Sequence, residues 1–379
     1  MTTSGPLAHA LSRFPLVPRK RALARPLGHR VERLTELAKA AEVNNDLVAA
    51  SGVHNLTALL AADRGLPELA RTLCFSHADL YLARRPLAAE HARLALEPLV
   101  NLANLAIRQG DGSAALYVLD ELARSVASGS DAVVGGQTVT LANLTVPGPA
   151  KGDVSEWLDN IRVYDGARAL VRDGRWVDAY LHFKQAGGGG RRMFDGRQVG
   201  VIALTVQGHA DLALKVLAEA PAEDPWEAVV ASSLTVACLL LTGRPCAEQA
   251  EEMINVHRGL KSHDDMLIFD LRLALTVSDL AAAAGRPGEA DRIFAGAARK
   301  TLAEPEGYSA RDLLAHSRSE NLTRAEREQL AASAAAAGLG ALHLSTEQEV
   351  RINAALTLAT KVITTALDAP QGMPAMATD

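Results

Sequence analysis

The sequence predicts an all-α protein, and three observations lead to that prediction. Aromatic residues make up only 4% of the 379 residues while alanine and leucine dominate, which favours closely packed helices over sheets. Hydrophobic residues account for 48% and charged residues for 22%, so the chain has enough apolar surface to form a core. Glycines recur at the ends of helix-like apolar stretches, as they do in an array of helix pairs.

Six glycines mark the turns of the predicted array, each ending one apolar stretch and opening the next: Gly65, Gly110, Gly174, Gly208, Gly243 and Gly285. An alanine follows five residues after all but one of them, at Ala70, Ala115, Ala179, Ala213 and Ala290, whereas Gly243 is followed by Ala247 and Ala250. Glycine permits the left-handed conformation that closes a first helix, and a small alanine lets the second helix pack closely against it. The pattern therefore predicts antiparallel helix pairs.

The segment Arg-Asp-Gly-Arg-Trp-Val-Asp-Ala-Tyr at residues 172–180 resembles the turn of a tetratricopeptide repeat (TPR), with Gly174, Trp176 and Ala179 in that family's relative positions. The intervals from Gly174 to Gly208 and from Gly208 to Gly243 are 34 and 35 residues, close to the period of that repeat. The resemblance covers about residues 45–302. It implies a TPR-like α-solenoid whose first helices line a concave, peptide-binding surface, and it implies no chemistry.

One β-hairpin is predicted within an insertion at about residues 128–152, with Gly135 and Gly136 forming a primed turn. The insertion accounts for the long interval between Gly110 and Gly174. Asp153, with Glu156 three residues later, predicts the start of the next helix. Because it lies between two helix pairs and ends in a Gly-Pro-rich loop, we expect the insertion to project from the array, and a lid is the function that such a position suggests.

The predicted domain organisation has four parts: a basic, partly disordered N-terminal arm at residues 1–30, the TPR-like array at 31–302, C-terminal helices at 303–368 that cap the array, and a disordered tail at 369–379. Two C-terminal helices are expected to begin at Thr323 with Glu326 and at Ser345 with Gln348, the second ending near residue 367.

The N-terminal arm carries six positive charges and no acid, so the rest of the chain has a net charge of −5 − 6 = −11; the six are Arg13, Arg19, Lys20, Arg21, Arg25 and Arg30. The arm is expected either to contact nucleic acid, an acidic partner or the protein's own acidic body, or to remain solvated. It lacks the apolar core of a secretory signal, and no stretch is apolar for the length of a membrane span. We therefore expect a cytoplasmic protein without a membrane partner; the Ala, Arg and Gly bias suggests a high-GC bacterial source.

Polar residues recur nine or ten positions before each turn glycine, and they predict a ligand-binding groove at one level of successive first helices. Adding neighbours on the same helices, the predicted groove residues are Asn55, Asn101, Asn104, Asp165, Gln198 and Arg272, with Ser233 and Thr276 at the same level and Asp265 and Asp279 one heptad either side of Arg272. The alternative is that these positions simply face solvent.

A possible anion site is predicted where glycines 187–190 precede Arg191, Arg192 and Arg197. The Gly-Lys-Ser/Thr ending of a Walker loop is missing, so a flexible turn is the alternative. No catalytic motif, metal-ligand spacing or cofactor signature is present, and the three cysteines are expected to be reduced thiols. We therefore expect no cofactor and no metal.

The sequence thus favours a non-catalytic module that binds a protein or peptide partner. Two alternatives remain. Residues 34–60, with Gly52 and Val53 between two helical segments, are similar to a helix-turn-helix, so a peptide-sensing transcriptional regulator that binds nucleic acid is possible. An enzyme of bacterial natural-product metabolism, with no recognisable motif, is the second. The oligomeric state is left open.

Overall fold

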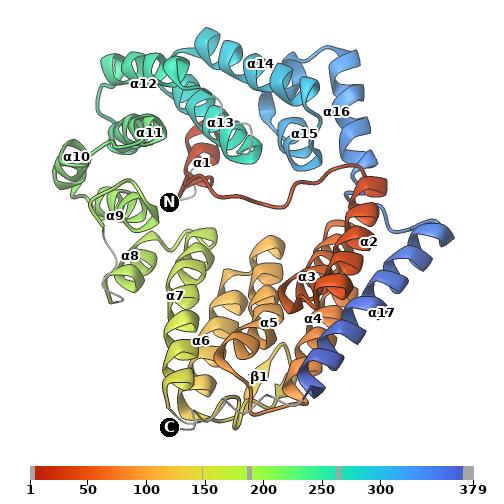
Figure 1. The fold of residues 1–379 in the computed structure, drawn as a ribbon. Coiled ribbons are helices and arrows are strands. Elements are labelled where there is room, and N and C mark those ends of the chain that lie inside the picture. The colour runs from red at the N-terminus through yellow and green to blue at the C-terminus, as the bar shows by residue number, and fades with distance from the viewer. Residues whose placement is uncertain (1–4, 147, 186–189, 262–265, 370–379) are drawn as a thin grey trace, which may run out of the picture. The chain divides into compact units, whose positions relative to one another are not determined.

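The computed structural model describes residues 5–146, 148–185, 190–261 and 266–369, which form an all-α fold with one short hairpin (Figure 1). The chain divides into two compact units. Unit 1 contains Met1–Pro26, Gly110–Ser113 and Val163–Ala337; unit 2 contains Leu27–Gln109, Ala114–Arg162 and Gly338–Asp379. Among the described residues, no helix is long and apolar enough to cross a membrane.

Each of the six predicted turn glycines lies between the two helices of a pair, with φ between 66° and 87°. The pairs are α3 (Leu47–Asp63) with α4 (Pro67–Leu82), α5 (Ala89–Gln109) with α6 (Gly112–Ser128), α7 (Pro149–Arg172) with α8 (Trp176–Gln185), α9 (Asp195–Val206) with α10 (Ala210–Ala218), α11 (Pro225–Leu241) with α12 (Ala247–Gly259), and α13 (Leu267–Ala283) with α14 (Pro287–Ala303). Ala70, Ala115, Ala179, Ala213, Ala250 and Ala290 are fully buried. The predicted helix pairs are therefore confirmed, and they are compatible with a helical repeat.

Unit 2 is assembled around α2 to α6, and the C-terminal helix α17 (Thr346–Asp368) packs against α2 (Leu27–Asn44), α3 and α4. In Figure 1 the blue α17 lies along the red α2 although more than 300 residues separate them in sequence. The expected break at Gly52 and Val53 is not present, because α3 runs through both residues; the chain turns at Asn45 instead, where φ is 50°. The resemblance to a helix-turn-helix therefore does not extend to the position of its turn.

The insertion forms the predicted hairpin, with β1 (Ala132–Val134) antiparallel to β2 (Gln137–Val139) and positive φ at Gly135 and Gly136. The expectation that it projects is wrong, because one face is buried in unit 2 through Ala132, Val134, Val139, Leu141 and Leu144. Glu121 of α6 accepts a hydrogen bond from the Val133 amide, and Arg71 of α4 donates one to the Gly135 carbonyl.

Helix α7 begins at Pro149, so the predicted start at Asp153 is also wrong. Proline is favoured in the first turn of a helix because its missing N–H and fixed φ cost nothing there. Asp153 and Glu156 therefore lie one turn or more inside the helix rather than at its start.

Unit 1 contains α1 (Pro6–Leu11), the end of α7, and helices α8 to α14, followed by α15 (Gly307–Leu314), the 3₁₀ helix η1 (Ser317–Asn321) and α16 (Arg324–Ala336). Its main core joins α9 to α14 with Phe14 and Leu16 from the N-terminal region. The predicted capping boxes at Thr323 with Glu326 and at Ser345 with Gln348 are confirmed, and they begin α16 and α17. Helix α15 and η1 were not anticipated by the sequence.

Candidate functional site

The N-terminal segment, defined as residues 6–26, lies against the first helices of the pairs in unit 1. Helix α1 packs on α13 and contacts α11, and the chain then continues as the extended red segment in Figure 1. Phe14 and Leu16 are 2% and 3% exposed and join the same apolar core as Trp226. The first helices of unit 1 therefore hold a peptide-like segment of the protein itself.

Gln198 of α9 binds the main chain of this segment at Leu16. Its Oε1 accepts from the Leu16 amide at 2.7 Å, and its Nε2 donates to the Leu16 carbonyl at 2.8 Å and to the Met193 carbonyl at 2.6 Å. Gln198 is fully buried, so these bonds satisfy an amide that would otherwise be costly to bury. A side-chain amide that pairs with both the N–H and the C=O of one residue can hold an extended backbone regardless of which side chain that residue carries.

Three buried acids bind the rest of the N-terminal segment. Asp195 pairs with Arg19 at 2.5 Å, Asp279 pairs with Arg13 at 2.7 Å, and Glu306 accepts from the Ala24 amide at 2.7 Å. Burial by itself raises the pKa of Asp279, but the hydrogen bond from His316 and the charge of Arg13 outweigh it and hold that pKa below its usual value. The arginines of the basic segment thus meet carboxylates of the protein's own body.

Unit 2 contains an open cavity of about 320 Å³ between α3, α5 and α7, and three of the predicted groove residues line it together. Asn101 Nδ2 donates to Asn55 Oδ1 at 3.1 Å, and Asn55 Nδ2 donates to Glu97 Oε2 at 3.4 Å. The walls between these groups are apolar and half-exposed, formed by Leu56, Leu59, Leu105 and Ile161. The cavity therefore offers a row of amides beside an apolar surface.

The amide row has hydrogen-bonding capacity to spare. Among the described residues, nothing donates to Asn101 Oδ1, and the Asn104 side chain forms no hydrogen bond. Glu97 lies at one end of the row, and Arg108, which pairs with Asp63, also lines the cavity. Burial raises the pKa of Glu97, and the hydrogen bond from Asn55 only partly offsets this effect.

The remaining groove residues lie in unit 1 and form intramolecular contacts. Asp165 pairs with Arg168 at 2.8 Å, and Arg272 lies 3.9 Å from a carboxylate oxygen of Asp312. Ser233 and Thr276 are fully buried and donate to carbonyls of their own helices, so they do not line a groove. Asp265 lies outside the described residues.

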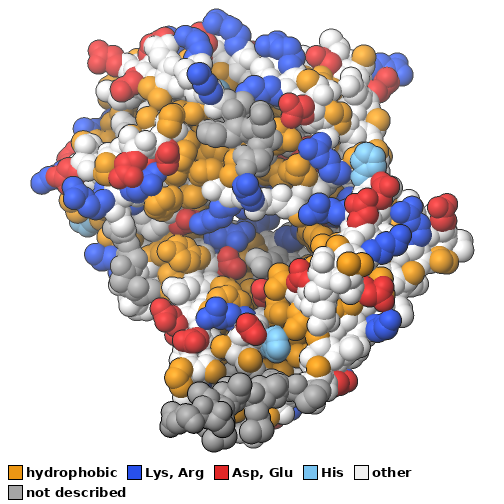
Figure 2. Space-filling view, in the orientation of Figure 1, with side chains coloured by type: hydrophobic (Ala, Val, Ile, Leu, Met, Phe, Trp, Pro, Cys, Tyr) orange, Lys and Arg blue, Asp and Glu red, His pale blue; other side chains and the backbone are white. Residues whose placement is uncertain are grey.

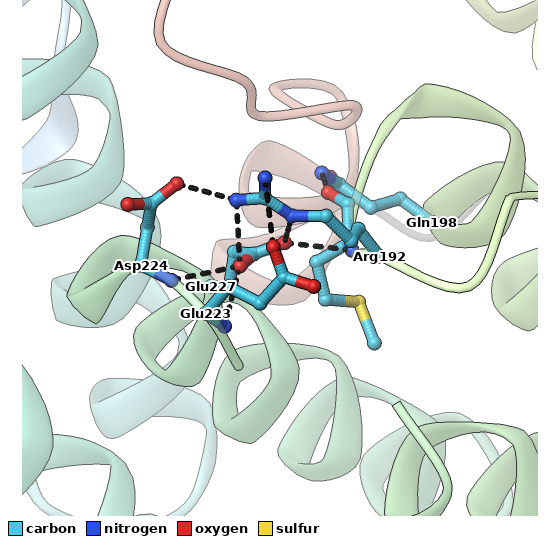
Figure 3. Close-up of polar contacts among 6 residues, drawn as sticks. Arg192, Gln198, Glu223, Asp224 and Glu227 are labelled. Atoms are coloured by element: carbon cyan, nitrogen blue, oxygen red, sulfur yellow. Dashed lines mark hydrogen bonds and ion pairs between the residues drawn. The ribbon is translucent and has the colours of Figure 1, made fainter. Parts of the chain in front are cut away.

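The predicted anion site near the start of α9 contains an arginine that is already neutralised by acids. The Arg192 guanidinium faces Glu223, Asp224 and Glu227, as Figure 3 shows, and the nearest oxygen of Glu227 is 3.0 Å away. Arg197 donates to the Gly190 and Val216 carbonyls, whereas Arg191 is exposed. Glycines 187–189 of this prediction lie outside the described residues.

The sequence analysis did not predict several residues that the structure places at these sites. Glu97 and Arg108 were missed although they share one face of α5 with Asn101 and Asn104, at spacings of three and four residues that the sequence displays. Asp195, one turn before Gln198, carried a similar signal. Glu306 carried none, because it binds a segment 282 residues away and only the fold brings the two together.

Comparisons with known proteins add no family to this description. No protein-family model matches the chain, and none of the curated proteins searched is significantly similar to it in sequence.

Proposed function

We propose that the chain is a TPR-like interaction module that binds an extended segment of a partner protein in the amide-lined cavity of unit 2. The proposal assigns no catalytic step. The partner's main chain would bind to Asn101 and Asn104, and its apolar side chains would pack on Leu56, Leu59 and Ile161.

One observation supports the proposal: in one helix pair of unit 1, the residue at the same position already holds the chain's own N-terminal segment. Gln198 lies ten residues before its turn glycine, Asn55 ten before Gly65, and Asn101 nine before Gly110. In unit 1 that position binds the Leu16 main chain through both of its amide atoms. In unit 2 the equivalent amides line an open cavity with unused hydrogen-bonding atoms.

The cavity has the size and lining expected of a specific but modest binding site. Its volume of about 320 Å³ accommodates a few peptide side chains, and its apolar walls with a few polar atoms are typical of ligand sites. A neutral hydrogen bond contributes about 0.5–1.5 kcal/mol, so affinity should depend on several amides together.

Selection of peptides from a displayed library against the immobilised full-length protein tests the proposal. We expect the selected peptides to bind Asn101→Ala about three- to tenfold more weakly, and Asn55→Ala/Asn101→Ala/Asn104→Ala at least 30-fold more weakly, because each lost hydrogen bond contributes about 1 kcal/mol. Asn353→Ala, at an exposed position of α17 in the same unit, is the matched control and should bind normally. Full affinity in a folded triple variant would exclude the cavity as the binding site.

A further inference from the structure

A cluster of arginines gathers along the N-terminal segment within unit 1. Its members lie close enough to influence one another electrostatically: Arg13, Arg19 and Arg21 from the segment, Arg168 from α7, Arg272 from α13 and Arg311 from α15. In Figure 2, Lys and Arg side chains are visible in the region where Figure 1 draws the extended N-terminal segment of unit 1. Like charges brought together in this way repel one another unless counter-charges offset them.

Carboxylates offset only part of this charge. Asp279 pairs with Arg13, Asp195 with Arg19 and Asp165 with Arg168, at distances of 2.5 to 2.8 Å. Asp312 is shared, lying 3.1 Å from Arg311 and 3.9 Å from Arg272. Six arginines therefore face these four aspartates, which leaves an excess of two positive charges.

Arg21 is the centre of this excess. Among the residues that the structure describes, it forms no ion pair and no hydrogen bond, yet it is surrounded by Arg19, Arg168 and Arg272. Burial, together with repulsion from Arg272, Arg168 and Arg19, lowers the pKa of Arg21 to about 10, and the charge of Asp165 offsets this only in part. Its side chain nevertheless remains exposed to solvent. A recessed but accessible guanidinium that forms no ion pair, and whose repulsion by three arginines exceeds its attraction to Asp165, is suited to a soluble anion.

We propose that Arg21, Arg168 and Arg272 bind the phosphate group of a small phosphorylated ligand. Guanidinium groups donate paired hydrogen bonds in a plane that matches phosphate oxygens, and two or three arginines together match a charge near −2. Asp165 and Asp312 hold Arg168 and Arg272 in place through ion pairs that leave further N–H donors on each guanidinium. This site is separate from the amide-lined cavity of unit 2.

The site links ligand binding to the N-terminal segment, because Arg21 belongs to that segment while Arg168 and Arg272 belong to the helices beneath it. A bound phosphate should therefore favour the docked segment, by the reciprocity that connects two coupled equilibria. The segment offers trypsin cleavage sites at Arg19, Lys20 and Arg21, so its docking can be measured directly.

The experiment uses inorganic pyrophosphate and inorganic phosphate as probes, titrated into the full chain at low ionic strength in a calorimeter. We expect one site per chain for pyrophosphate, at least tenfold weaker binding by Arg21→Gln and by Arg272→Gln, and slower trypsin cleavage of the segment when pyrophosphate is present. Arg244→Gln is the matched control, since Arg244 is an exposed arginine of unit 1 that pairs with Asp211 outside the cluster.

Arg21→Gln separates binding from folding. Because Arg21 forms no ion pair and the repulsion from Arg19, Arg168 and Arg272 exceeds the attraction of Asp165, this variant should be at least as thermally stable as the natural protein without an anion. It should lose the stabilisation that pyrophosphate provides. Unchanged pyrophosphate affinity in both arginine variants would overturn the proposal, as would the absence of any binding by the natural protein. Binding of duplex DNA that both substitutions abolish, without binding of pyrophosphate, would also overturn it and assign the cluster to nucleic acid.

Discussion

His54 and His77 stack in the core of unit 2, with ring centroids 4.8 Å apart. His77 is 1% exposed, and neither of its ring nitrogens has a hydrogen-bond partner among the described residues. Burial lowers the pKa of His54 to about 4, and burial together with the neighbouring His54 lowers that of His77 to about 3. Both imidazoles are therefore neutral in the folded protein at neutral pH.

The histidine pair should make unit 2 sensitive to acid. The ordinary histidine pKa is 6.5, so below that pH the unfolded chain binds two protons that the folded chain does not. The free energy of unfolding therefore has its full value above pH 6.5 and falls as the pH drops toward 4. Each histidine lowers it by up to about 1.4 kcal/mol for every pH unit. The free energy of unfolding, measured with urea, should decrease between pH 7.5 and pH 5, and in His77→Phe this decrease should be smaller by about 2 kcal/mol.

His343→Gln is the control for this measurement, because His343 is exposed in the same unit and should leave the pH dependence unchanged. If His77→Phe showed the same loss between pH 7.5 and pH 5 as the natural protein, the protons would be taken up elsewhere.

Single residues also show which parts of the candidate site the sequence could predict. Asn55, Asn101 and Gln198 were identifiable because the repeat places them at one level, and a polar amide in an apolar helix needs a partner. The identity of that partner was not predictable. Gln198 binds Leu16, 182 residues earlier, and no local pattern encodes a pairing over that distance.

At the scale of elements, the helix pairs were predictable because glycine with positive φ and a small alanine are local requirements of each turn. The start of α7 was not predictable, because Asp153 and Glu156 satisfy a capping pattern that is also compatible with a helix interior. The burial of one face of the hairpin was not predictable from β1, because Ala-Val-Val is apolar at all three positions, whereas in the structure these side chains alternate buried, exposed and buried.

The hairpin should contribute to the stability of unit 2, contrary to its expected role as an appendage. Val134 is fully buried, and Val134→Ser removes apolar surface and places a hydroxyl there. We expect a loss of about 2–3 kcal/mol, because both the lost methyl groups and the buried polar atom destabilise the fold. Val133→Ser is the matched control, since Val133 is exposed on the same strand and should change stability by about 0.5 kcal/mol or less. Equal melting temperatures for the two variants would mean that the hairpin packs only loosely.

At the scale of the molecule, neither unit is continuous in sequence. Unit 1 combines the N-terminal segment with helices α8 to α16, while unit 2 combines α2 to α6 and the hairpin with the distant helix α17. Each unit is therefore closed by a segment from far along the chain: residues 6–26 in unit 1 and α17 in unit 2. The recurring glycines and alanines predicted one array of helices, but the division into two units depends on long-range contacts that a periodic pattern does not contain.

Because each unit has its own closing segment, a destabilising substitution in one segment should increase local unfolding in its own unit first. Phe14→Ala leaves a cavity under the N-terminal segment in unit 1, where Phe14 is 2% exposed, and should cost about 3–5 kcal/mol. With Phe14 shortened, the buried partners Gln198, Asp195 and Asp279 would be exposed more often to water. Hydrogen exchange followed by mass spectrometry should then show faster exchange in α9, α11 and α13.

The reciprocal variant decides whether this loss of protection is local. Ile363→Ala removes a fully buried side chain of α17 and should accelerate exchange in α2 and α3 of unit 2, while α9 and α13 keep the protection that they have in the natural protein. If both variants accelerated exchange equally throughout the described helices, the two units would unfold as one cooperative body. The N-terminal segment would then stabilise the whole chain and not unit 1 alone, because sub-global opening requires that each closing segment contribute mainly to its own core.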